Sequence, residues 1–264
     1  MTTTWTSWGP TADQPQQHYL VEPRHLADGG DLRHVTEYLR ACGWQDLSRT
    51  GGPMVFDSPD RLVRIGFDPT ATPGGWTVSG KAAGQQPAWN VTFTMAVPIE
   101  VVAGFTDTLT KPRSAHAPNV WAPLEEHGWE TSRVEEHFTA VAPDGNAWLQ
   151  YHQSAPGQAH WWAGARTEHG RSWDAVFTPT TPMHLIQGFS AALADPTPVM
   201  RPLGHVPATK FIRTTSVSVR PSELGHWQQA RITAARAATW ARNSWTAARP
   251  RRQTPTPAGA RTRR

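Results

Sequence analysis

The strongest constraint on this chain of 264 residues is an internal repeat. When the sequence is shifted by 84 positions, residues 89–94 (WNVTFT) fall on residues 173–178 (WDAVFT), and 7 of the 21 ungapped positions from 89 to 109 are identical. Because this spacing exceeds the roughly 20 to 50 residues of solenoid repeats, it indicates a duplicated small domain. Further matches lie upstream, where Pro59-Asp60 falls on Pro143-Asp144 and, with one gap, Gly43-Trp44 falls on Gly128-Trp129.

Each copy carries the same order of predicted elements. In copy one, Leu32, Val35 and Leu39 follow helical spacing, and Gly43 supplies a stop signal. Alternating apolar and polar residues then predict four strands, and Pro98 opens a closing helix. Turn residues between the first two strands predict a hairpin in both copies. The predicted strands are residues 53–56, 63–67, 75–81 and 89–95.

This order predicts an α+β fold made of two pseudo-symmetric copies of a helix, a four-stranded antiparallel meander and a helix. One face of each sheet is left for the other copy to cover, with the copies packed either face to face or edge to edge. The expected boundaries are a disordered N-terminus (1–17), copy one (18–112), copy two (113–200), a linker or extended segment (201–220), a basic amphipathic helix (221–249) and a disordered basic tail (250–264).

Large aromatic residues recur at equivalent positions of the two copies. Repetition of a large apolar side chain is what a common core requires, so we expect these residues to be buried rather than to stack nucleic-acid bases. Trp148 and Trp162 have no Trp counterpart in copy one and are therefore candidates for an exposed patch or a contact between the copies. The predicted repeat core consists of Trp44, Trp129, Trp76, Trp161, Trp89, Trp173, Phe93, Phe177, Phe105 and Phe189.

The formal net charge of +4 is divided very unevenly. Residues 210–264 hold 12 Lys or Arg and a single acid, Glu223, and so carry +11, whereas residues 1–209 carry −7. A basic end on an acidic body is typical of a chain that meets phosphate backbones or acidic partners. The expected contacts to nucleic acid or an acidic partner are Arg231, Arg236, Arg242, Arg249, Arg251 and Arg252.

The alanine-rich segment 221–249 has high helix propensity. Three alternatives remain open for this helix: it docks a tryptophan-bearing face on the body with its arginines in solvent, it binds an acidic partner or DNA, or it lies on an anionic membrane surface. The apolar flank expected to dock comprises Leu224, Trp227, Ala234, Ala238 and Trp245.

The chain also resembles a known family. Residues 19–27 (YLVEPRHLA) lead into the first helix and, with Gly43-Trp44 and the paired WNVTFT and WDAVFT strands, are similar to tandem proteins of the domain-of-unknown-function family 317. That family is actinobacterial and common in Streptomyces. The likeness covers residues 18–200, and it implies neither an established enzymatic activity nor catalytic residues.

Motifs for catalysis and cofactors are lacking, so we expect no enzyme, cofactor or metal. There is no phosphate-binding loop, no Gly-x-Ser-x-Gly and no dinucleotide fingerprint. His127, His137, His152 and His160 do not follow metal-ligand spacing. The single cysteine, Cys42, lies on the apolar stripe of the first helix, fits the core and is compatible with a cytoplasmic protein. No stretch approaches the apolar length of a transmembrane helix.

Together these observations predict a non-catalytic cytosolic binding or adaptor protein. Its basic C-terminal helix and tail are expected to contact nucleic acid or an acidic protein. The alternative is a protein interaction module that uses the groove between the copies and does not bind nucleic acid.

Overall fold

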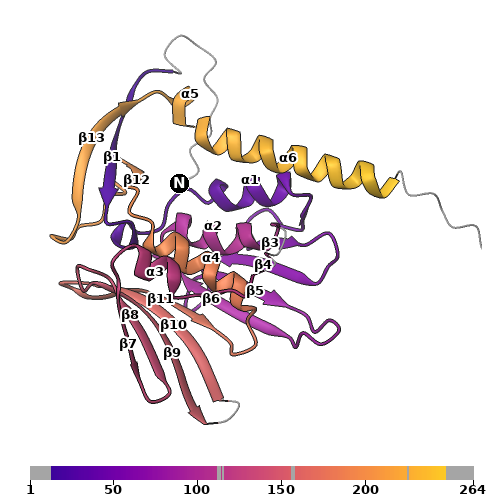
Figure 1. Cartoon of the computed structure of the whole chain (residues 1–264). Coiled ribbons are helices and arrows are strands. Elements are labelled where there is room, and N and C mark those ends of the chain that lie inside the picture. Colours follow the sequence, from indigo (N-terminus) through magenta and orange to yellow (C-terminus); the bar gives the residue numbers. More distant parts are fainter. Residues whose placement is uncertain (1–12, 112–113, 115, 156–157, 225, 248–264) are drawn as a thin grey trace, which may run out of the picture.

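The structure, a computed structural model, describes residues 13–111, 114, 116–155, 158–224 and 226–247. Its centre is a ten-stranded antiparallel sheet with strand order β2-β3-β4-β5-β6-β11-β10-β9-β8-β7. Figure 1 shows the helices gathered on one face of this sheet, with a second, three-stranded sheet beside them. The element classes agree with the predicted α+β fold.

Copy one forms the first half of the large sheet. Val35 and Leu39 of its first helix are fully buried, and Gly43, at φ +83°, follows the end of that helix in a conformation that glycine adopts without strain. The elements are α1 (Arg33–Ala41), β2 (Gln45–Asp46), β3 (Met54–Asp57), β4 (Val63–Asp68), β5 (Gly75–Gly80), β6 (Trp89–Thr94) and α2 (Ile99–Thr108).

Copy two repeats this order of elements. The hairpin between its second and third strands has Gly145 at φ +72°, where the matching turn of copy one has Arg61 at φ +58°. The elements are α3 (Ala122–Glu126), β7 (Glu130–Val134), β8 (His137–Val141), β9 (Ala147–Ala155), β10 (Gln158–Thr167), β11 (Gly170–Phe177) and α4 (Met183–Ala194).

Each copy contains five strands, so the predicted four-stranded meander was one strand short. The missed strands are β2 and β7. β2 has only two residues, and all five residues of β7 are exposed, so neither strand shows the alternation of buried and exposed residues that sequence reasoning uses. Both strands lie at the ends of the ten-stranded sheet.

The two copies meet edge to edge. Strand β6 pairs with β11 in antiparallel register, with Phe93 opposite Ala175, Thr92 opposite Val176 and Val91 opposite Phe177. This pairing makes the two meanders one continuous sheet. Of the two packings left open by the sequence, the edge-to-edge alternative is therefore the one observed.

Helices α2 and α4 pack against each other above this junction. A Cβ atom on Gly104 would lie 2.7 Å from the carbonyl oxygen of Gly188, and a Cβ on Gly188 would lie 2.8 Å from the carbonyl oxygen of Gly104. The two helices can approach this closely only because both positions lack a side chain. Gly104 and Gly188 are also matched residues of the internal repeat.

Four phenylalanines fill the space between the helix pair and the sheet. The ring centroids of Phe93 and Phe189 lie 5.8 Å apart, and those of Phe105 and Phe177 lie 5.9 Å apart. Each ring is at most 1% exposed. Two of these residues come from each copy, so the copies share one core instead of folding around two separate ones.

The three-stranded sheet is built from segments far apart in the chain. Strand β1 (Gln16–Glu22) lies between β12 (Val199–Pro202) and β13 (Arg213–Val219), and both pairings are antiparallel. The predicted N-terminal boundary therefore moves from residue 18 to Gln16. Much of the segment 201–220, expected to be a linker or an extended segment, forms paired strands. Residues 1–12 and 248–264, which contain the predicted disordered tail, lie outside the described residues.

Arg201 of β12 ties this small sheet to the helical layer. Its side chain is 2% exposed, and Nη1 and Nη2 each donate to a carboxylate oxygen of Glu100 at 2.8 Å. The same guanidinium donates to the carbonyl oxygens of Ala27, Asp28 and Gly29 at 2.9 to 3.0 Å. Because its charge is paired and its donors are bonded, Arg201 can be buried between the two layers.

Helix α6 (His226–Ala247) follows the short α5 (Pro221–Leu224) and packs on α1 (Figure 1). Within the described ranges, no helix is both long and apolar enough to cross a membrane.

Candidate binding surfaces

The ten aromatic residues expected to form the repeat core all lie inside the protein. Trp44, at 7%, is the most exposed of them, and Phe105, Phe177 and Phe189 are fully buried. Trp173 also donates from its indole nitrogen to the carbonyl oxygen of His25 at 2.8 Å. None of these rings is available to stack a ligand. Cys42 is likewise buried in the core.

Arg231 has a different role from the one expected. Its Nε donates to Asp107 Oδ2 at 2.8 Å, its Nη2 contacts the other oxygen of Asp107, and its Nη1 donates to the carbonyl oxygen of His34 at 2.7 Å. The guanidinium carbon also lies 4.0 Å from the ring centroid of Tyr38. The Arg231 side chain is only 19% exposed, so it anchors α6 to the body and is not an open contact for a polyanion.

The face of α6 that docks also differs from the predicted apolar flank. Ile232 and Ala235 are buried beside Arg231, whereas Ala234 and Ala238 are exposed. The prediction was therefore wrong for Ala234 and Ala238, while the side chains of Leu224, Trp227 and Trp245, its other members, lie outside the described residues. The orientation of the helix is set by the buried acceptor Asp107, on α2, which lies 124 residues away in the sequence.

The other predicted basic contacts lie farther along the same segment. Arg236 is exposed, and Trp240, four residues on and 74% exposed, lies on the same side of α6. The Arg242 side chain and residues Arg249, Arg251 and Arg252 lie outside the described residues, as do the side chains of Trp227 and Trp245.

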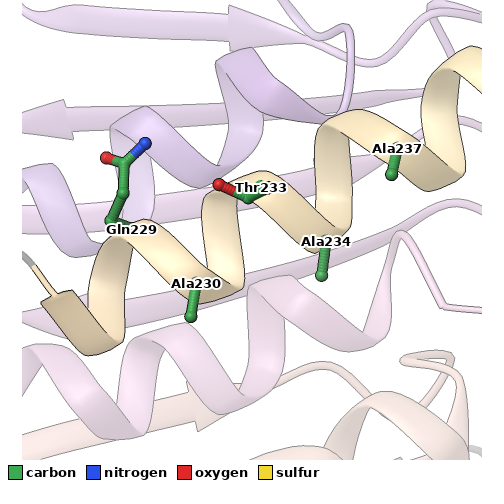
Figure 2. Close-up of a pocket in the computed structure, with 5 residues that line it drawn as sticks. All are labelled: Gln229, Ala230, Thr233, Ala234 and Ala237. Atoms are coloured by element: carbon green, nitrogen blue, oxygen red, sulfur yellow. The ribbon is translucent and has the colours of Figure 1, made fainter.

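A shallow hollow of about 620 Å³ runs along α6. Figure 2 shows the side chains of Ala230, Ala234 and Ala237 pointing downward and that of Gln229 pointing upward; with Thr233, they line one stretch of the helix. All five lining side chains are small or uncharged. None of these five side chains is titratable near neutral pH.

A second cleft, of about 480 Å³, lies on the sheet face opposite the helices. Trp148 of β9 alternates with the buried Ala147 and Leu149, and Trp162 of β10 alternates with the buried Trp161 and Ala163, so both tryptophans project from the other face. The complete lining is Val141, Gly145, Trp148, Gln150, Trp162, Arg166, Gly170 and Arg171.

The two tryptophans of this cleft form one packed unit. Their ring centroids lie 5.7 Å apart with the ring planes at 75°, an edge-to-face arrangement. Gly164, paired directly with Trp148, makes room for the indole, because a Cβ atom there would lie 2.5 Å from its ring. Both tryptophans are partly exposed, and the ring and hydrogen-bond contacts described for them stay within copy two.

Polar groups hold Trp162 in place. Its indole Nε1 donates to Asp174 Oδ1 at 2.8 Å, and the Arg171 guanidinium carbon lies 4.6 Å from the ring centroid. Arg171 also faces Asp174, with Nη1 3.4 Å from Oδ1. The indole Nε1 of Trp148 is buried and has no hydrogen-bond partner among the described residues.

Three histidines continue across the same face beside the cleft. His137 stacks on His152 with ring centroids 3.7 Å apart, and His152 meets His160 edge to face at 5.5 Å. Desolvation and the neighbouring histidines lower the pKa of His152. In the part of the chain that the structure describes, no group of three or more His, Cys, Asp or Glu residues could hold a metal ion.

A pair made of a buried histidine and a more exposed carboxylate lies at the boundary between the small sheet and copy two. His25 Nε2 lies 3.0 Å from Asp144 Oδ2 in the β8–β9 turn. Burial raises the pKa of Asp144, but the hydrogen bond and charge of His25 and the backbone N–H of Asn146 lower it further, to about 2. The His25 carbonyl already binds Trp173, so this pair fastens two elements.

The fold and these surfaces define a protein with two tandem copies of one α+β unit joined through a shared sheet. The model of the SPDY family, a domain of unknown function (DUF317), matches residues 57–115 and 141–199. The matched segments begin 84 residues apart, the spacing of the internal repeat, and they cover a narrower part of the chain than the predicted 18–200. The matches support a tandem-repeat protein that carries this domain twice.

Each match spans the third to fifth strands of a copy and its closing helix. Helix α6 lies outside the matched segments. The three-stranded sheet also lies outside them, except for Val199, the first residue of β12. No curated protein and no solved structure matches the chain.

Proposed function

We propose that this chain is a non-catalytic binding protein for nucleic acid, and that its basic C-terminal segment supplies the contact to the phosphate backbone. The observation that supports this most strongly is the separation of charge, with +11 on residues 210–264 and −7 on the rest. Polyanion binding of this kind is driven by counterion release and weakens steeply with salt.

The docking of α6 favours the same function. One arginine of the segment, Arg231, fixes the helix on α1 and α2, while Arg236, one turn further on, is exposed. The ion pair with Asp107 thus uses one positive charge to hold the helix that carries Arg236. A helix held in this way loses less conformational freedom when a partner binds than a free segment would.

The acidic residues of the body support this choice of surface. Five exposed glutamates gather in α3, in β7 and in the β7–β8 turn, at the far end of the large sheet from copy one: Glu125, Glu126, Glu130, Glu135 and Glu136. Helix α6 packs on copy one instead. A polyanion is repelled from the glutamate end and attracted to the α6 end.

We further propose that the two copies are related by an approximate twofold axis between β6 and β11, and that the protein acts in the cytoplasm of an actinobacterium. The matched glycines and phenylalanines at the junction support the symmetry. The single cysteine is compatible with a reducing compartment.

The test compares the full chain with a chain that ends at Ala247. This shortened chain keeps all described elements, whereas a cut before residue 221 removes α6 and a cut before residue 213 also removes β13, which pairs with β1. Labelled single-stranded DNA, duplex DNA and RNA are titrated at low and moderate salt. A full chain in which Arg249, Arg251 and Arg252 are replaced by Gln serves as the matched control for length.

We expect the full chain to bind with strong salt dependence. The chain ending at Ala247 and the triple Gln variant should bind more weakly, and the slope of log K against log salt should fall by about 0.7 to 0.9 for each phosphate that the variant no longer neutralises. If the full chain fails to bind at low salt, or if both variants bind with the same slope as the full chain, the proposal is wrong.

A further inference from the structure

We propose that the cleft formed by Trp148 and Trp162 is a stacking site for an unpaired nucleobase of a single-stranded nucleic acid. Figure 1 shows the helices on one face of the large sheet, and the cleft lies on the opposite face, which no described element covers. The inference rests on the proposed function for its class of partner. It goes further by assigning a base-binding site in a part of the molecule that is distinct from the basic segment.

Trp162 is held in a fixed orientation. Its ring is partly exposed and is fixed at its nitrogen by Asp174 and at its edge by Trp148. A ring held on two sides is a preformed platform, because little side-chain entropy is lost when a ligand stacks on it. Every base has a flat π face, so such a platform accepts bases without strict sequence preference.

Arg171 stacks on this platform. Its guanidinium lies 4.6 Å from the Trp162 ring centroid, while its side chain is 54% exposed. This contact shows that the indole face accepts a flat, delocalised group. A base that enters can take the place of the guanidinium on the ring and leave Arg171 to pair with the adjacent phosphate.

Polar groups line the rim of the cleft. Gln150 lies directly opposite Trp162 and offers an amide donor and acceptor to the edge of a base. Arg166, which is exposed and donates from Nη2 to the carbonyl oxygen of Gly145 at 3.2 Å, provides a second cation.

The sheet around Trp162 has room for a single nucleic-acid strand. Of the two copies, only copy two carries the pair of tryptophans. The lateral row that contains Trp162 continues across the copy junction through small side chains, with Val176 and Thr92 in successive register. These small side chains leave room for a nucleic-acid strand beside Trp162. The repeat places Arg64 and Thr77 of copy one at the positions of Trp148 and Trp162, so copy one lacks both tryptophans.

The cleft volume agrees with a small planar ligand. About 480 Å³ lies within the range of small-molecule sites and suits one or two nucleotides but not a duplex. A base in a duplex is already stacked and paired and cannot lie on Trp162 without being flipped out. We therefore expect single strands to be preferred.

The experiment follows the tryptophan indole N–H resonances of the ¹⁵N-labelled full chain while oligothymidine is added at high salt. High salt suppresses the backbone contact of the basic segment but leaves stacking largely intact. The variant Trp162→Thr installs the residue that copy one has at this position. The variant Arg171→Gln leaves the platform in place, and Thr77→Ala is the matched control on the same sheet face in copy one.

We expect the Trp162 and Trp148 resonances to shift with oligothymidine and not with duplex DNA. Trp162→Thr should weaken binding about tenfold or more, the loss expected for one stacked base, and Arg171→Gln should weaken it less, while Thr77→Ala should bind like the parent chain. Circular dichroism of each variant verifies the fold. If the Trp162→Thr variant does not fold, the indole shifts of the parent chain and the binding of the Arg171→Gln variant decide whether the cleft holds a base.

Unchanged indole resonances in a chain that still binds at low salt would overturn the base site and leave the proposed function standing. If the indole resonances shift at high salt but the chain shows no salt-dependent binding at low salt, the base site in the cleft stands. The proposed role of the basic segment is then wrong. Equal shifts with duplex DNA, or undiminished binding by a folded Trp162→Thr variant, would also overturn the base site.

Discussion

His34 couples folding to pH at the scale of a single residue. Desolvation lowers its pKa from 6.5 to about 4; Glu100 and Asp31 oppose this shift, and Arg231 and Arg201 reinforce it. The unfolded chain therefore binds a proton at this residue that the folded chain does not, so stability is lost as the pH falls from about 6.5 toward 4. We expect the free energy of unfolding to fall by about 2 kcal/mol between pH 7 and pH 5 from this residue.

Urea denaturation of the parent chain and of His34→Gln at both pH values measures this effect. The variant should lose less stability on acidification, because Gln does not titrate. Asp144, with its lowered pKa, acts in a separate window, since its contribution is lost only as the pH falls from about 3.8 toward 2. An identical pH dependence of the two chains between pH 7 and 5 would rule out His34 as the cause.

The buried ion pair between Arg201 and Glu100 makes the second prediction at this scale. Replacing Arg201 by Met leaves the Glu100 carboxylate buried without its partner and removes the guanidinium donor from the carbonyls of Ala27, Asp28 and Gly29. Of these three carbonyls, that of Gly29 keeps the backbone N–H of Ile99 as a donor. We expect a loss of about 3 to 5 kcal/mol in the free energy of unfolding. Arg33→Met is the control, because its ion pair with Asp31 is exposed and should contribute at most about 1 kcal/mol. Comparable losses in the two variants would contradict the assigned role of Arg201.

At the scale of elements, the crossing of α2 and α4 decides whether the copies form one body. Gly104→Ala places a methyl group against Ala192 and the Gly188 carbonyl oxygen, so the helices must separate or bend. We expect a loss of about 1 to 3 kcal/mol from overpacking. Gly52→Ala is the matched control, because a Cβ there would lie 3.6 Å from its nearest neighbour. Thermal unfolding of both variants measures the difference, and a stable Gly104→Ala variant would mean that this contact is not close-packed.

The elements also show what the sequence could and could not predict. Strands with alternating burial, such as β4 and β6, and helices with an apolar stripe, such as α1, were visible because their side chains follow the structural period. Strand β7 was invisible because all its residues are exposed. Strand β13 depends on pairing with β1, about 200 residues away, and that partner leaves no local signal.

The candidate surfaces follow the same rule. Trp148 and Trp162 could be singled out because the repeat left them without counterparts, but their meeting with Arg171 required the register of β9, β10 and β11. Arg231 could not be separated from its neighbouring arginines by sequence, because its acceptor Asp107 is on another helix. Long-range pairing, and not local propensity, decides which charges stay in solvent.

For the whole molecule, the two proposed binding sites lie in different places. The helix-covered face, with α6, holds the basic segment in place, and the uncovered face of copy two presents the tryptophan cleft. The acidic body between them limits nonspecific attachment elsewhere. We therefore expect a bound single strand to make separate contacts near residues 148–171 and in the C-terminal segment.

Photo-cross-linking of the full chain to oligothymidine, followed by mapping of the modified peptides, tests this arrangement most directly. We expect cross-links in peptides that contain Trp148 or Trp162 and in peptides from residues 226–264, with the second group disappearing first as salt is raised. Cross-links confined to α3, β7 and β8, or none at any salt concentration, would contradict the assignment of both sites.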